Sequence, residues 1–140
     1  MDYITKFSKN TSVLTIIVTG KYNRPQDAKI LQQYMMEFCK ENDCRKILVN
    51  LKDAVLVGTT LDIFNASTMP GDPDHNLLKS KIALLYKRIT EDQRFVENVA
   101  FNRGYYNVHV FDNDDDAMEW LLPTEEQISK KHHNNNNKKI

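Results

Sequence analysis

Glycine, proline, cysteine and tryptophan are all scarce in this 140-residue chain, which has four glycines, four prolines, two cysteines and one tryptophan. The glycines lie far apart, at Gly20, Gly58, Gly71 and Gly104, so they assemble neither a phosphate-binding Walker loop nor a dinucleotide-binding fingerprint. The nucleophile elbow of hydrolases is missing too. We therefore expect a non-enzymatic protein with no catalytic residues and no cofactor.

Excess charge of either sign is also missing, because 19 Lys and Arg residues balance 19 Asp and Glu residues. Nucleic-acid binders and polybasic membrane binders usually carry a basic excess. No apolar run approaches the ~18 residues of a membrane-spanning helix, and the start Met1 to Phe7 has no signal-peptide core. These absences predict a cytoplasmic protein whose partners include neither nucleic acid nor a membrane to span.

The two cysteines, Cys39 and Cys44, would form at most a single bridge across a tight bend. One bridge is a thin framework for a secreted domain. We expect both to be reduced thiols, with Cys39 in the core.

What the chain does contain is an alternation of strand-like and helix-like segments, which predicts an α/β fold. The first two strands form an antiparallel hairpin, and residues Gly20 to Arg24 break the second of them. The expected strands are Tyr3 to Phe7, Val13 to Thr19, Lys46 to Leu51, Ile82 to Tyr86 and Asn107 to Phe111.

About four helices are expected between and after these strands. They begin at Pro25, at Thr59, at the capping box Thr90 to Gln93 and at Asn113, and Gly104 is placed to end the third. The predicted architecture is a mixed, mostly parallel sheet with an N-terminal hairpin, in one domain over residues 1–123. Residues 124–140 are polar and predict a disordered tail rather than a metal site.

Three stretches in the last third of the domain are informative together: Arg103-Gly104, Val108 to Phe111 and Ala117 to Leu121. With the order of the elements, they make the chain resemble the SpoIIAA-like branch of the STAS superfamily (sulfate transporter and anti-sigma factor antagonist). Members of this branch are small, stand-alone bacterial proteins. The resemblance implies a STAS-like fold and a regulatory module that binds another protein.

The resemblance also implies a phosphorylated serine in an Asp-Ser-Ser-Gly-like turn after the third strand. Thr59 and Thr60 lie at the serine positions, but Gly58 replaces the acid and Leu61 replaces the glycine. A helix start favours a phosphate, whereas Asp62 would repel one. We favour Thr59 as a helix cap and keep Thr59 and Thr60 as candidate phosphoacceptors.

Other polar residues have structural interpretations. His75 lies in a proline-rich loop, and His109 alternates with valines on a short strand, with no partner carboxylate identifiable in the sequence. Asp112 to Asp116 superficially follows a calcium loop, but Ala117 and Pro123 stand where an EF-hand needs glycine and glutamate. We therefore predict no metal site and interpret these acids as favourable charges at a helix start.

One region favours a binding function. The loop Asp53 to Gly58 carries consecutive apolar residues at the carboxyl end of a strand, where open α/β sheets bind ligands, and the long connection Met69 to Ser80 adds two leucines. The predicted partner or ligand surface consists of Leu56, Val57, Gly58, Leu61, Leu77 and Leu78.

Two hypotheses for this surface stay open. In the first it docks a partner protein. In the second it holds a small hydrophobic ligand, as the similarity of SpoIIAA-like folds to lipid-binding Sec14-type domains implies. Separately, Tyr105 and Tyr106, expected to be exposed beside Gly104, are candidates for a homodimer contact.

Overall fold

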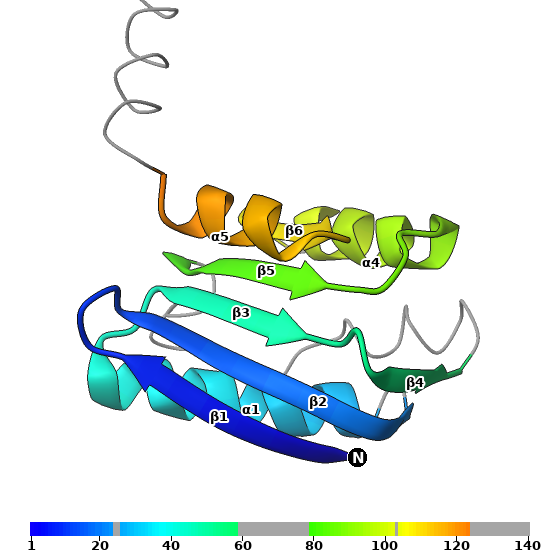
Figure 1. Cartoon of the computed structure of the whole chain (residues 1–140), viewed down its shortest axis with the longest axis horizontal. Helices are drawn as coiled ribbons and strands as arrows, with labels where there is room; N and C mark the ends of the chain where they lie inside the picture. Colours follow the sequence, from blue (N-terminus) through cyan, green and yellow to red (C-terminus); the bar gives the residue numbers. More distant parts are fainter. Residues whose placement is uncertain (24–25, 59–78, 103, 124–140) are drawn as a thin grey trace, which may run out of the picture.

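The computed structural model describes residues 1–23, 26–58, 79–102 and 104–123, and within them a six-stranded sheet carries helices on both faces (Figure 1). The strands are β1 (Asp2–Ser8), β2 (Val13–Asn23), β3 (Lys46–Asn50), β4 (Ala54–Val57), β5 (Lys81–Leu85) and β6 (Val108–Phe111). The helices are α1 (Gln26–Asn42), α4 (Glu91–Asn102) and α5 (Asp114–Leu121). The helix expected from Thr59 and the tail 124–140 lie outside the described residues, so the domain boundary at residue 123 stays a prediction.

The sheet order is β1-β2-β3-β5-β6, in which only the β1–β2 pair is antiparallel. This confirms the predicted mixed, mostly parallel sheet with an N-terminal hairpin. The central strand β3 shows why a parallel sheet suits this sequence. Ile47, Leu48 and Val49 are consecutive and all buried, so the strand is covered by apolar groups on both faces, as is typical of parallel strands.

The second strand is longer than predicted, and this corrects two expectations. Gly20 does not end β2; its φ of +76° is a left-handed conformation that lets the strand bend and continue to Asn23. This extension pairs in parallel with Ala54–Val57, which was expected to be a loop and is strand β4. A partner strand distant in the sequence therefore decides the structure of both segments.

Two apolar clusters hold the helices to opposite faces of the sheet. Leu31, Met35 and Cys39 of α1 pack into the larger cluster, and Ala100 of α4 contacts the same cluster. Ala117 and Leu121 of α5, both fully buried, pack against β3 and β5 in the second cluster. Burial of these two stripes is the main stabilising contribution, because apolar area is removed from water on both faces.

The predicted helix ends are confirmed at three places. The backbone N–H of Thr90 donates to Gln93 Oε1 at 2.8 Å before α4, and Asn113 Oδ1 accepts from Asp115 N at 2.8 Å before α5. Gly104, with φ +93°, follows α4, where Tyr105 N donates to the carbonyl oxygen of Ala100 at 2.9 Å.

The tyrosines after Gly104 correct another expectation. Tyr105 is only 9% exposed and belongs to the core, so it is not available as a dimer contact. Tyr106 is 60% exposed and packs edge-on against Phe101, with ring centroids 4.8 Å apart. A homodimer contact at this position would therefore rest on Tyr106 and not on the pair.

The edge strand β6 is held by a carboxylate from α4. Glu97 Oε2 accepts a hydrogen bond from the backbone N–H of Val110 at 2.8 Å. Edge strands expose such donors, which otherwise bond to water or to another chain. Glu97 thus satisfies a backbone group of the edge strand and ties α4 to it.

We predict that Glu97→Ala lowers the free energy of unfolding by about 1–3 kcal/mol, because Val110 N–H then loses its acceptor. Glu97→Gln keeps an acceptor oxygen and is the matched control, with a smaller loss. Urea unfolding followed by circular dichroism measures both, and equal stability of the alanine variant and the parent would contradict this role of Glu97.

Candidate functional site

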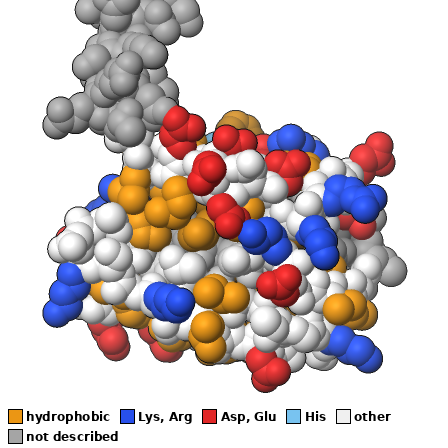
Figure 2. Space-filling view, in the orientation of Figure 1, with side chains coloured by type: hydrophobic (Ala, Val, Ile, Leu, Met, Phe, Trp, Pro, Cys, Tyr) orange, Lys and Arg blue, Asp and Glu red, His pale blue; other side chains and the backbone are white. Residues whose placement is uncertain are grey.

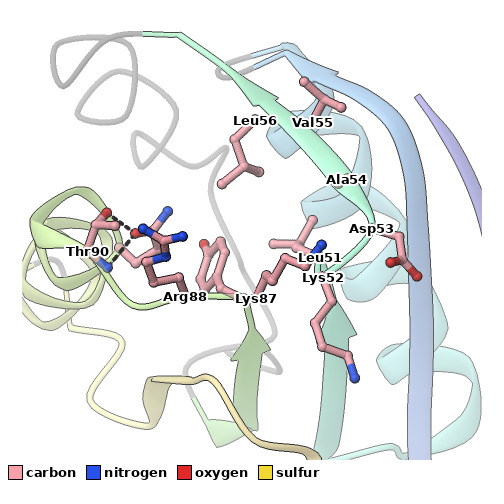
Figure 3. Close-up of a pocket in the computed structure, with 11 residues that line it drawn as sticks. Leu51, Lys52, Asp53, Ala54, Val55, Leu56, Lys87, Arg88 and Thr90 are labelled. Atoms are coloured by element: carbon pink, nitrogen blue, oxygen red, sulfur yellow. Dashed lines mark hydrogen bonds between the residues drawn. The ribbon is translucent and has the colours of Figure 1, made fainter.

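A cleft opens where the sheet divides. Leu51 N donates to the carbonyl oxygen of Leu85 at 2.7 Å, which joins the end of β3 to the end of β5. Lys52 N then donates to Asn50 Oδ1 at 3.0 Å, so the chain turns and β4 continues along β2 instead of beside β5. Figure 3 shows the resulting space between β4 and the segment that follows β5.

The cleft has a volume of about 470 Å³ and lies at the carboxyl ends of β3 and β5. This end of an open α/β sheet is where ligands usually bind. Its walls come from β4, from the residues after β5 and from the start of α4. The lining residues are Leu51, Lys52, Asp53, Ala54, Val55, Leu56, Tyr86, Lys87, Arg88, Thr90 and Gln93.

The apolar wall of the cleft is β4. Leu56 points into the cleft (Figure 3) and also packs against the larger apolar cluster. The neighbours on the strand alternate with it: Val55 is 58% exposed and Val57 is 40% exposed. Exposed valines on a short strand leave apolar area in water, which favours contact with another molecule.

The structure describes only half of the predicted surface, and the binding role of these residues stays a prediction. Leu56 lines the cleft, and Val57 and Gly58 are exposed at the end of β4. Leu61, Leu77 and Leu78 lie outside the described residues, as do the candidate phosphoacceptors Thr59 and Thr60 and the loop residue His75.

The charged residues of the cleft were missed by the sequence analysis. Lys52 Nζ lies 2.7 Å from Asp114 Oδ1, so α5 holds this lysine at the turn between β3 and β4. Lys87 and Arg88 are exposed at the opposite wall. Two adjacent cations after a strand are typical of any solvated loop, and only the tertiary arrangement places them over a cleft.

Thr90 and Gln93 have a structural role in the wall. Gln93 is 6% exposed, and its Oε1 accepts from both the backbone N–H and the hydroxyl of Thr90. The amide oxygen is thus engaged in the helix cap, and this end of α4 lines the cleft together with Tyr86 to Arg88. The cap positions the wall.

His109 has a partner carboxylate that the sequence analysis did not find. Its Nδ1 lies 3.6 Å from Glu97 Oε1, and its ring packs edge-on against Trp120 at 4.9 Å between centroids. The other oxygen of Glu97 accepts from Val110 N, so the carboxylate is engaged in the fold. Within the ranges given above, no three or more His, Cys, Asp and Glu residues are grouped to hold a metal ion.

The cysteines form a buried pair of free thiols, each 2% exposed. A hydrogen bond with Cys39, helped by backbone hydrogen bonds at Lys46 and Leu14, lowers the pKa of the Cys44 thiol to about 6, although burial raises it. A lowered pKa favours the reactive thiolate. Burial keeps reagents away from it, so the pair belongs to the core, as predicted for Cys39.

We predict that iodoacetamide leaves both thiols of the native protein unmodified over a time that labels the urea-unfolded protein completely. The physical reason is burial, which outweighs the lowered pKa. Intact mass spectrometry counts the added groups, and a Cys39→Ser variant assigns any single addition. Native labelling as fast as that of the unfolded chain would show that Cys44 is an accessible nucleophile.

Comparison with known proteins supports the architecture. No family model matches the sequence, and no curated protein matches it. The structure is similar to the crystal structure of an uncharacterized protein from the DUF3478 family of Shewanella loihica, described as having a SpoIIAA-like fold. The TM-score is 0.52 at 14% identity, over 86% of this chain and 93% of that one. The fold is therefore SpoIIAA-like.

Among the helices of the described residues, none is both long enough and apolar enough to cross a bilayer.

Proposed function

We propose that this protein is a non-enzymatic interaction module that docks a partner protein at the cleft beside β4. The observation that carries the proposal is the divided sheet: the cleft lies at the carboxyl ends of β3 and β5, with β4 as one wall. Ligands of α/β sheets bind at this end. The SpoIIAA-like fold is compatible with this role without assigning it.

The edge of β4 supports a protein partner. In the described part of the chain, β4 pairs with β2 alone, through four residues, and its other edge borders the cleft. An extended peptide can add to such an edge through main-chain hydrogen bonds, with alternate side chains giving specificity. Leu56, which points into the cleft, and Val55, an exposed residue of the cleft lining, supply apolar contacts.

The alternative occupant is a small hydrophobic ligand, as in Sec14-type domains, for which the structure offers the cleft and a second, apolar cavity. The apolar cavity between α1 and α4 is lined by Met35, Val96 and Tyr105 among others, and its volume is about 90 Å³. Drug-sized ligands occupy roughly 300–1,000 Å³. This cavity is therefore too small for a lipid. The cleft beside β4, at about 470 Å³, is large enough for a small ligand, but Lys52, Lys87 and Arg88 in its lining do not suit an apolar molecule, so we prefer docking of a protein.

Native mass spectrometry of freshly purified protein separates the two functions. We predict the mass of the bare chain, because the cavity between α1 and α4 has no room for a lipid chain and the larger cleft is lined by charged side chains. A co-purifying mass of lipid size, released by organic solvent, would favour the carrier and count against docking as the main function.

Site-specific photocrosslinking in the native host tests docking directly. We predict that Val55→benzoylphenylalanine captures a discrete partner, whereas Ile4→benzoylphenylalanine on β1 does not. The two positions are matched in exposure, at 58% and 59%, so a difference between them reports location. Leu56→Ala should lower the crosslink yield while the fold persists, since Leu56 is only partly buried. Identical adducts from both positions, or none from Val55, would refute the cleft as the docking site.

A further inference from the structure

The described lining of the cleft carries an excess of positive charge, although charge is balanced over the chain. Its described residues include three cations, Lys52, Lys87 and Arg88, against one carboxylate, Asp53. The whole chain has 19 residues of each sign, and Figure 2 shows acidic and basic side chains mixed across the face it displays. A local cationic excess favours an anionic occupant.

Within the described residues, two of the three cations have no acidic partner. Lys52 is neutralised by Asp114 at 2.7 Å. In the described ranges no carboxylate forms an ion pair with Lys87 or Arg88, and both side chains are exposed. They follow β5 directly, and Figure 3 places them across the cleft from Leu56 of β4. An incoming carboxylate would therefore displace no acid of the described ranges from these two cations.

The two walls of the cleft differ in chemistry, and together they describe one occupant. Leu56 and Ala54 of β4 are apolar and lie on a strand whose cleft-side edge has no partner strand in the described part. An arginine binds a carboxylate through two parallel hydrogen bonds, and an adjacent lysine adds a point charge. Since side chains alternate along a strand, an extended segment can present carboxylates to one wall and apolar groups to the other.

We propose that the occupant of the cleft is an acidic segment of a partner protein, which adds to β4 as a strand and places its carboxylates against Lys87 and Arg88. This inference rests on the proposed docking function and specifies the chemistry of the partner. Binding of such a segment weakens as salt is added, because exposed charges are screened.

Fluorescence anisotropy with defined peptides tests the charge requirement. The probe is a labelled peptide of about ten residues that alternates glutamate and valine, and its counterpart alternates lysine and valine. We expect the glutamate peptide to bind and the lysine peptide not to bind. The double variant K87E/R88E should weaken binding by about tenfold or more, since both cations become repulsive.

A charge-matched variant isolates position from net charge. K6E/K9E on the N-terminal hairpin changes the total charge by the same amount at two exposed lysines outside the cleft, and it should alter affinity by no more than about twofold. Amide chemical shifts of the labelled protein should move at residues 54–57 and 86–90. Equal weakening by both double variants, equal binding of the lysine peptide, or shifts confined to other elements would each overturn the proposal.

Other anionic occupants give distinct results. If inorganic phosphate produces the same amide shifts and displaces the peptide at equal concentration, the cleft is a simple anion site and the proposal fails. If the chain self-associates and K87E/R88E abolishes this, the occupant is a second copy. If crosslinks from position 55 persist in K87E/R88E, docking stands and the acidic chemistry alone is refuted.

Discussion

The long strand β2 is the constraint on which the rest of the structure depends. It pairs with β1 along one edge, and along the other edge with β3 and then with β4. Of the two strands that follow one another along β2, only β3 also pairs with β5, whereas β4 does not. The sheet must therefore divide where β3 ends, and the cleft is the geometric result of that division.

The division also explains why the two sides of the cleft differ in chemistry. The β4 side is part of the sheet and carries the apolar side chains that a strand over a core requires. The opposite side is the segment that follows β5, where Lys87 and Arg88 are exposed and are not part of the core. Between them, Lys52 is held by α5 through Asp114, so the helix on the far face of the sheet also sets the geometry of the turn.

Much of the fold was predictable because its signals are local. The buried run in β3, the capping box at Thr90, the left-handed residue Gly104 and the cap Asn113 each act within a few residues. They are therefore readable from the sequence without knowledge of the partner elements. The parallel sheet follows from the same alternation of elements.

The errors share one physical cause, which is long-range pairing. From the local sequence, Gly20 is expected to end a strand and Ala54–Val57 is expected to be a loop. Both segments are strands because they pair with each other. Tyr105 reads as exposed next to a turn, but α4 and the sheet bury it. Lys87 and Arg88 line a cleft only because β4 forms its opposite wall. Local propensity carries no information about such neighbours.

The single-sided pairing of β4 has a thermodynamic consequence. A strand of four residues that is bonded to one neighbour in the described part of the chain can detach by a local opening that leaves the core intact. Its amides should exchange with solvent at a lower free-energy cost than those of β3. A molecule that adds to the edge of β4 unpaired within the described residues would suppress this local opening, so part of the binding free energy goes into ordering the protein itself.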